Sequence, residues 1–236
     1  MIDLFITTHG RQDLFKKSLS SLLSSTDRTQ YRLTIVVDGG ISQGTEKSCF
    51  DEADHVLWHK ESLGLGPSIN QALIHISNLN TYFDNNKSHF ICMVQDDIEY
   101  EKGWLDKLVK VHSLFSRTHK IGFVSGHNAP EHATVGEIKF GKDTLLLKPW
   151  IRATNMFTTA EYFLSMYPIP RMDPETGRER ARPHGGMGSS VDWWLIRNHP
   201  NSVCKSGRVN IVWPGLIRHI GDKSSTWLGR DLPEDK

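Results

Sequence analysis

The chain has 236 residues, of which 38% are hydrophobic and 23% are charged. This length and composition exclude a largely disordered chain and allow a sizeable core. Lys and Arg number 28 against 27 Asp and Glu, a formal net charge of +1, which gives no support for nonspecific binding to nucleic acid or anionic membranes.

The three cysteines are far apart and form no CxxC pair, so neither a disulfide framework nor a cysteine zinc site is indicated. Cys92 lies in an apolar run, and we expect it to be a small buried side chain. No signal peptide pattern is evident, and no apolar run approaches the ~20 residues that span a bilayer. We therefore expect a cytoplasmic protein without an integral membrane segment.

Short β-rich runs alternate with amphipathic helical patterns in the first half of the chain. After Gln12, for example, Phe15, Leu19 and Leu22 recur at helical spacing. Strands that alternate with helices predict βαβ units and an α/β fold with a mostly parallel central sheet flanked by helices. The predicted strands are 2–8, 31–37, 55–58, 90–94 and 121–125, and the predicted helices begin near Gln12, Pro67 and Trp104.

The pattern after residue 126 is less regular. Residues 138–147 predict a hairpin around Gly141, residues 151–158 a strand and residues 160–166 a short helix. Residues 167–188 are rich in proline, glycine and arginine. We interpret them as a long mobile loop, with a lid over the site as one hypothesis and a solvated loop as the alternative.

Polar, turn-forming residues follow three of the predicted strands, at 7–11, 38–40 and 95–97. In an open parallel sheet, ligands bind beyond the carboxyl ends of the strands. We therefore interpret Asp96 and Asp97, which follow a buried strand, as functional residues rather than a solvated turn.

In chain order, these segments resemble the GT-A type of glycosyltransferases, and family 2 in particular. The resemblance runs from residue 2 to about residue 226. The matching segments are 7–11 (TTHGR, a strand followed by T-x-x-R), 36–40 (VVDGG, a second strand ending in Asp), 63–70 (LGLGPSIN, the glycine-rich start of a helix), 95–97 (QDD, the DxD metal motif), 189–194 (SSVDWW, the helix start with the catalytic base) and 218–221 (RHIG, the late histidine segment).

The resemblance implies a Rossmann-like nucleotide-diphospho-sugar transferase fold in a single domain, 1–236. Residues 1–126 would form the nucleotide-sugar-binding half, and residues 127–236 the acceptor and catalytic half. Metal-dependent, inverting transfer is expected, with Asp192 as general base and Asp97 and His219 holding Mn²⁺ or Mg²⁺. The implied donor contacts are Thr7, Thr8, Arg11, Asp38, Gly64, Asp96 and Arg218.

The resemblance favours a UDP-linked sugar as donor, because the family commonly uses one and Asp38 could accept from the uracil N–H. The acceptor stays open between a glycan, a protein, a small molecule and a modified nucleic-acid base. Structural roles also stay open: Asp38 as a turn residue, Asp192 as a helix-start acid, His219 as a structural histidine and Arg11 as a surface arginine.

Two positions depart from the family pattern. Gln95 stands at the first acidic position of DxD, and Val191 stands where the family often has Glu. These departures keep open a noncatalytic nucleotide-sugar or glycan-binding relative. A nucleotidyltransferase is less favoured, because residues 8–12 lack a glycine-rich phosphate loop. Trp193, Trp194 and Trp227 could supply flat faces for sugar stacking near the acceptor. Trp193 or Trp194 could equally pack its helix against the sheet.

Overall fold

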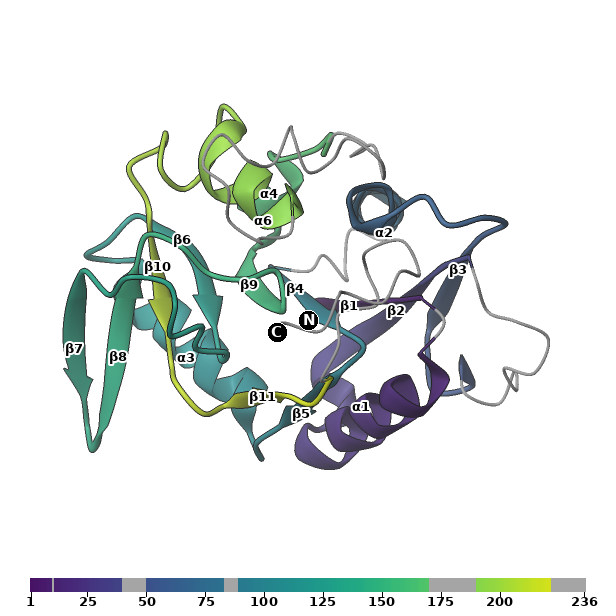
Figure 1. Ribbon diagram of the computed structural model, residues 1–236, viewed down its shortest axis with the longest axis horizontal. Coiled ribbons are helices and arrows are strands. Elements are labelled where there is room, and N and C mark those ends of the chain that lie inside the picture. Colours follow the sequence, from purple (N-terminus) through teal and green to yellow (C-terminus); the bar gives the residue numbers. More distant parts are fainter. Residues whose placement is uncertain (10, 40–49, 83–88, 170–189, 222–236) are drawn as a thin grey trace, which may run out of the picture.

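The computed structural model describes residues 1–9, 11–39, 50–82, 89–169 and 190–221 (Figure 1). The strands are β1 (Ile2–Thr8), β2 (Tyr31–Asp38), β3 (His55–His59), β4 (Phe90–Gln95), β5 (Ile98–Tyr100), β6 (Ile121–Ser125), β7 (Gly136–Phe140), β8 (Asp143–Lys148), β9 (Asn155–Thr159), β10 (Val209–Val212) and β11 (Ile217–His219). The helices are α1 (Gln12–Ser25), α2 (Leu65–Tyr82), α3 (Trp104–Phe115), α4 (Ala160–Leu164) and α6 (Ser190–Trp193), with a 3₁₀ turn η1 (Arg28–Gln30) and a π-helical turn η4 (Trp194–Asn198) directly after α6.

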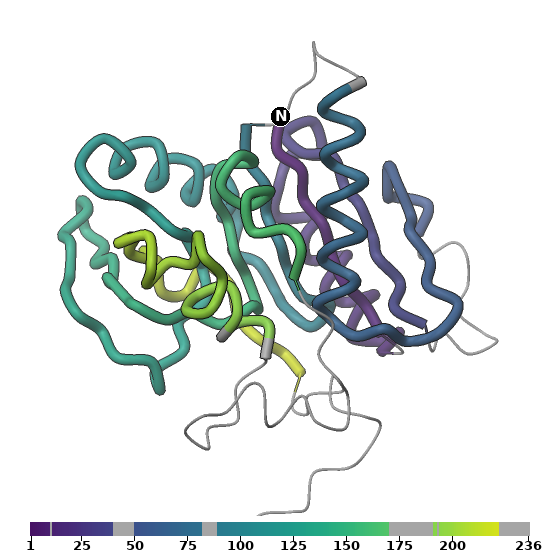
Figure 2. Tube along the Cα trace, turned by 90° about the horizontal axis from the view of Figure 1, so that it is seen from above, coloured from purple at the N-terminus to yellow at the C-terminus, as the bar shows by residue number. Residues whose placement is uncertain are grey.

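Nine of these strands form one sheet, in the order β3-β2-β1-β4-β9-β6-β10-β8-β7, while β5 and β11 pair separately. In the large sheet, β8 and β9 run against the other strands. The predicted α/β architecture, a mostly parallel sheet flanked by helices, is therefore confirmed. Figure 2 shows the first and second halves of the chain side by side along this sheet.

The winding of the sheet reverses at β1. Strands β2 and β3 follow β1 towards one edge, and β4 then pairs with the free side of β1. Right-handed crossovers in the two directions place α1 and α2 on opposite faces (Figure 1). Such a reversal leaves a crevice beyond the carboxyl ends of the two strands on either side of it, here β1 and β4.

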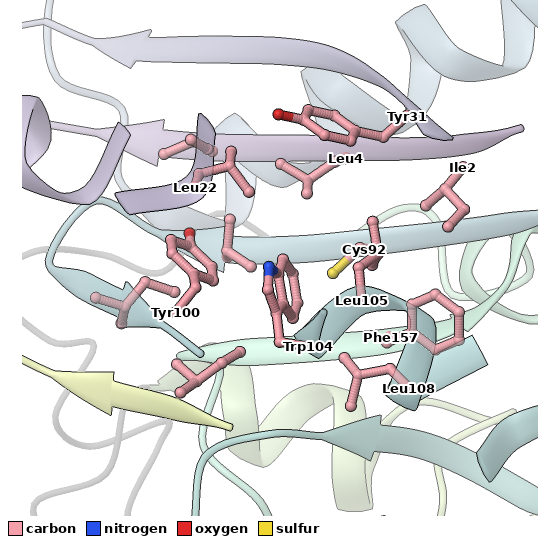
Figure 3. Close-up of a cluster of buried hydrophobic side chains, with 14 of the residues drawn as sticks. Ile2, Leu4, Leu22, Tyr31, Cys92, Tyr100, Trp104, Leu105, Leu108 and Phe157 are labelled. Atoms are coloured by element: carbon pink, nitrogen blue, oxygen red, sulfur yellow. The ribbon is translucent and has the colours of Figure 1, made fainter. Parts of the chain in front are cut away.

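Each face of the sheet carries its own core. Along β1, Leu4 and Ile6 pack on the side of α1 and α3, whereas Phe5 packs on the side of α2. Figure 3 shows Trp104 in the first of these cores; its side chain and that of Cys92 are fully buried. Cys92 was predicted to be a buried side chain, and its burial confirms this.

Most predicted elements match the structure closely, including the hairpin, whose turn contains Gly141 at φ +62°. The strand predicted at 151–158 begins only at Asn155, because Ile151 and Ala153 are buried in the α2-side core without pairing. Strands β5, β10 and β11 were not predicted, since three or four residues carry too little periodicity.

Residues 170–188 of the predicted 167–188 loop lie outside the described residues. Its start is held against α2, where the side chain of Asn70 donates to the carbonyl of Ile169 over 2.6 Å and accepts from its amide over 2.8 Å. In the described ranges, no helix is long and apolar enough to cross a membrane.

Candidate functional site

Asp96 and Asp97 form the turn between β4 and β5, at the carboxyl end of β4, beside β1, where the winding of the sheet reverses. Each residue is only 1% exposed. Two buried carboxylates side by side repel each other and lose hydration, so they need cations or hydrogen-bond donors nearby. The donors come from two distant parts of the chain, the end of β1 and the end of β11.

The segment after β1 supplies a hydroxyl and a guanidinium. Thr8, the last residue of β1, donates its hydroxyl to Oδ2 of Asp96 over 2.7 Å. Arg11, at the start of α1, donates to both carboxylates: one terminal nitrogen contacts Oδ2 of Asp97 over 2.5 Å, and the other contacts Oδ1 of Asp96. Because the Arg11 side chain is 15% exposed, these charge-assisted contacts are little screened by water.

The segment after β11 encloses Asp97 from the other side. Nε2 of His219 lies 3.0 Å from Oδ2 of Asp97, and the amide of Ile220 donates to the Asp97 carbonyl over 2.8 Å. A Cβ atom at Gly221 would stand 2.5 Å from Oδ2 of Asp97. Glycine at this position is therefore what leaves room for the carboxylate.

The pKa values of the Asp96 and Asp97 carboxyl groups are shifted in opposite directions. Burial raises the pKa of Asp96 and outweighs the opposing effect of Arg11 and Thr8. Burial also acts to raise the pKa of Asp97, but the contacts from His219 and Arg11 outweigh it, and that pKa is lowered. Asp97 is thus the carboxylate that keeps its negative charge more firmly.

Asp97 and His219 fit a hard divalent cation. Oδ1 of Asp97 is buried and has no hydrogen-bond partner among the described residues. Nε2 of His219 lies 3.0 Å from Oδ2 of Asp97, so an imidazole and a carboxylate are close enough together that they would hold one divalent cation between them. No cluster of three His, Cys, Asp or Glu is found in the described part of the chain. Asp97 and His219 would supply two ligands to such a cation and leave its other positions to other groups.

The carboxylate of Asp38, at the end of β2, accepts hydrogen bonds from all three residues of the 62–64 turn and from His59. Oδ1 accepts from Nδ1 of His59 over 2.8 Å and from the amide of Leu63 over 2.7 Å, while Oδ2 accepts from the Ser62 hydroxyl over 3.0 Å and the Gly64 amide over 2.8 Å. Burial raises the pKa of Asp38, but these four hydrogen bonds outweigh it and the pKa is lowered. Its contact with a nucleotide base stays a prediction.

Glycine is favoured at Gly39 and at Gly64 for different reasons. A Cβ atom at Gly39, where φ is +64°, would lie 2.3 Å from the backbone nitrogen of Ser62, so the turn packs directly on glycine backbone. At Gly64 φ is +91° and a Cβ atom would meet nothing within 4 Å. The left-handed conformation alone favours glycine there.

Asp192 lies in the first turn of α6, as predicted, and is buried. Its Oδ1 accepts a hydrogen bond of 2.9 Å from the amide of Ala153. The carbonyl of the next residue, Thr154, accepts from the amide of Gln95 over 3.1 Å. One side-chain hydrogen bond and one backbone hydrogen bond thus connect Asp192, through residues 153–154, to the strand end that precedes Asp96. Its neighbour Val191 is 2% exposed and packs in the α2-side core.

Two predicted residues are less close to this centre. Arg218 precedes His219 on β11, and successive strand residues point to opposite sides. It donates from Nε to Glu99 over 3.1 Å, and its side chain is 75% exposed, so the structure does not bring Arg218 to Asp97. Thr7 is buried in β1, where its backbone pairs with Val36 and Gln95.

Two histidines at strand ends were missed. His59 ends β3 and contacts Asp38; the predicted strand stopped one residue before it. His127 follows β6, and its ring centroid is 6.3 Å from that of His219. Burial and the neighbouring His219 lower the pKa of His127. The signal that selected Thr8 and Asp96, a polar residue at the carboxyl end of a strand, was available for both.

The three tryptophans considered for sugar stacking have different outcomes. Trp194 packs against the α2-side core as a partly buried side chain, which agrees with the core alternative. Trp227 lies outside the described residues, as does the side chain of Trp193.

Comparison with solved structures defines the class of fold: the chain has the fold of the GT-A type of glycosyltransferases. The mannosyltransferase PcManGT from Pyrobaculum calidifontis, solved in complex with GDP-Man and Mn²⁺, is similar with a TM-score of 0.60 and 14% sequence identity over 95% of this chain. TarS 1–349 from S. aureus, solved in complex with UDP-GlcNAc, is similar with a TM-score of 0.55 and 11% identity over 98% of this chain.

A further TarS structure from S. aureus has a TM-score of 0.52 and 12% identity over 91% of this chain. This chain spans 58%, 61% and 35% of the three structures, respectively. No protein-family model matches the chain, and no curated protein sequence matches it. The similarity therefore defines the fold, and the chemistry has to be argued from the site.

Proposed function

We propose that this protein is a metal-dependent glycosyltransferase that transfers a sugar from a nucleotide-diphosphate sugar to an acceptor hydroxyl, with inversion at the anomeric carbon. The observation that carries the proposal is the buried pair Asp96–Asp97 at the β1/β4 crevice, contacted by Thr8, Arg11 and His219. A buried pair of carboxyl groups where the winding of the sheet reverses, with the guanidinium of Arg11 beside it, suits a cation and a diphosphate together.

Asp97 and His219 are the proposed ligands of Mn²⁺ or Mg²⁺. The orphaned Oδ1 of Asp97 and the lowered pKa of its carboxyl support this assignment. When bound, the cation would offset the negative charge that builds up on the leaving diphosphate. His219 favours Mn²⁺ over Mg²⁺, because imidazole is a poorer ligand for Mg²⁺.

The donor nucleotide is assigned to the ends of β1 and β2. Thr7, Thr8, Asp38 and Gly64 line that edge, and the turn held by Asp38 presents backbone there. A UDP-linked sugar is favoured. Arg218 is not needed in this assignment, since it pairs with Glu99 at the surface.

Asp192 is the proposed general base. The hydrogen bond from Ala153 fixes one carboxylate oxygen, and a fixed carboxylate can take the proton from an acceptor hydroxyl as the new bond forms. A base on the side opposite the leaving group gives inversion. The acceptor is a hydroxyl of a glycan, a protein, a small molecule or a modified nucleic-acid base.

The test is release of nucleoside diphosphate from a panel of UDP-, GDP- and dTDP-sugars, with Mn²⁺ and with EDTA. Asp97→Ala is compared with the wild type, and Glu99→Gln serves as a control from the neighbouring strand that pairs with Arg218 instead. Mn²⁺-dependent release from one donor, lost in Asp97→Ala and kept in Glu99→Gln, would support the proposal.

Other outcomes point to the other candidate functions. Donor binding without turnover, over a broad acceptor panel, would indicate a noncatalytic nucleotide-sugar or glycan-binding protein; the core position of Val191, where the family often has an acid, favours this candidate. Release of pyrophosphate would indicate a nucleotidyltransferase.

A further inference from the structure

The guanidinium of Arg11 lies against Asp96 and Asp97, and Asp97 is one of the two proposed metal ligands. The guanidinium makes one contact with each carboxylate, and it shares Oδ2 of Asp97 with His219. Elsewhere, Arg32 pairs with the single carboxylate of Asp3 through two contacts, of 2.7 and 3.0 Å. Arg11 therefore differs from Arg32, because it divides one positive charge between two buried carboxyl groups.

The Arg11 contacts are also incomplete. Its Nε is buried without a hydrogen-bond partner among the described residues, and so is Oδ1 of Asp97. An unpartnered donor and an unpartnered acceptor in one buried cluster carry a desolvation cost that a bound ligand would relieve. Nε of Arg11 could donate to an anion, and Oδ1 of Asp97 could bind a cation.

We propose that Arg11 is a tethered cation that exchanges partners on substrate binding: it neutralises Asp96 and Asp97 in the empty site and moves to the donor diphosphate when a divalent cation takes Asp97. This inference rests on the proposed function. It assigns Arg11 a competitive role towards the metal in the absence of nucleotide and a cooperative role in its presence.

Electrostatic repulsion favours the exchange. A divalent cation at Asp97 and a guanidinium on the same carboxylate oxygen would repel each other strongly in a buried site. The diphosphate offers the displaced guanidinium a more highly charged partner that it can contact through two nitrogens. The backbone of Arg11 is anchored, because its carbonyl accepts from the Phe15 amide over 2.9 Å, so the move is one of the side chain.

Such an exchange couples the two ligands thermodynamically. Mn²⁺ alone has to displace Arg11, which weakens its binding. Once the diphosphate is present, Arg11 contributes to binding instead of opposing it. By linkage, each ligand strengthens the other by the same factor.

The experiment measures Mn²⁺ affinity by electron paramagnetic resonance of free Mn²⁺, with and without saturating UDP, after subtraction of the Mn·UDP complex formed without protein. Arg11→Gln is compared with the wild type, and Arg32→Gln is the matched control at the opposite end of β1 and β2. Circular dichroism and thermal melting establish that each variant is folded.

Without nucleotide, we expect Arg11→Gln to bind Mn²⁺ about tenfold more tightly than the wild type. The factor by which UDP strengthens Mn²⁺ binding should fall about tenfold or more in this variant and stay unchanged in Arg32→Gln. Arg11→Lys keeps the charge, so its Mn²⁺ affinity without UDP should stay near that of the wild type while the coupling to UDP weakens. If Arg11→Gln does not fold, Arg11→Lys decides: unchanged coupling to UDP overturns the inference.

A folded Arg11→Gln variant that binds Mn²⁺ equally or more weakly without nucleotide would overturn the exchange and leave the proposed function intact. Wild-type protein that binds UDP but not Mn²⁺ would make Arg11 a permanent cation, which also overturns the exchange. Absence of Mn²⁺ binding, and of binding of UDP, GDP and dTDP, in the wild type and in Arg32→Gln would remove the proposed function, and the inference with it.

Discussion

The carboxylate of Asp192 and the backbone amide of Ala153 are joined by a hydrogen bond of 2.9 Å. This contact fixes an acid from the beginning of α6 beside the segment that leads into β9. Because Thr154 pairs with Gln95 at the end of β4, the same segment connects the proposed base with the proposed metal site.

Replacement of Asp192 by asparagine should separate catalysis from donor binding. The amide oxygen can still accept from Ala153, but it cannot take a proton from the acceptor. We expect Asp192→Asn to lower kcat by about 10²- to 10⁴-fold, with the Kd for the donor unchanged. Asp106→Asn is the control, since Asp106 also lies in the first turn of a helix but is exposed on α3. An equal loss in both variants would contradict a catalytic role for Asp192.

Addition of one methyl group at Gly221 should disturb the metal site without altering any polar group. The new Cβ would stand 2.5 Å from Oδ2 of Asp97, so the carboxylate has to shift. We expect Gly221→Ala to weaken Mn²⁺ binding about 10- to 100-fold. The measurement is a calorimetric titration with Mn²⁺ in the presence of UDP.

Gly215→Ala provides the contrast to Gly221→Ala. Gly215 has φ +85° and a Cβ atom there would meet nothing within 4 Å. This variant should lose about 1 kcal/mol of stability through backbone strain and keep its Mn²⁺ affinity. Unchanged Mn²⁺ binding in Gly221→Ala would contradict the prediction, because it would mean that the Asp97 carboxylate can shift without loss of the cation.

The contribution of the Asp38 hydrogen bonds to the free energy of unfolding should depend on pH in a defined direction. The pKa of Asp38 is lowered in the folded state, so the stabilisation is present above the ordinary pKa of an aspartate and is lost as pH falls through the lowered value. We expect Asp38→Asn to lower the free energy of unfolding by about 2–3 kcal/mol at pH 7, with a smaller difference below about pH 4. Urea unfolding at both pH values tests this, with the exposed Asp51→Asn as control. A difference that is independent of pH would contradict the ionic role.

His112 should destabilise the fold at mildly acidic pH. Burial next to Arg208 lowers its pKa to about 4, and its ring packs edge-on against Phe90 and Phe157. The unfolded chain therefore binds a proton more readily below about pH 6.5, so stability falls as pH decreases from there towards 4. At pH 5 the contribution is on the order of 2 kcal/mol.

His112→Phe keeps a ring and removes the titrating group. Its free energy of unfolding should fall less steeply between pH 7 and pH 5 than that of the wild type, as measured by urea unfolding across that range. Parallel pH profiles for the two proteins would assign the acid sensitivity to other groups.

Much of the fold was predictable from local patterns. The run 90–94 predicted a buried central strand because all of its residues are apolar, and β4 has that position. The helix predicted after Gln12 begins at that residue. The order of strand-end segments was enough to indicate the GT-A type of fold before any pairing was known.

The contacts of the site were not predictable in the same way. Strands β5 and β11 are three residues each, too short for a periodic signal, yet their pairing brings His219 to Asp97 from 122 positions away in sequence. The same pairing directs Arg218 to Glu99 at the surface. A strand shifted by one residue would exchange the two side chains, and sequence alone does not set that register.

The sequence by itself determined most of the longer strands and helices, because hydrophobic periodicity is a local property, and it placed Asp38, Asp96 and Asp97 at strand ends. Only the tertiary structure decided their partners: Arg11 lies across Asp96 and Asp97, and Asp38 holds its own turn. The physical reason is that partner choice depends on distances between segments far apart in the chain. These distances are set by the order and register of the strands and by the packing of the helices on the two faces of the sheet.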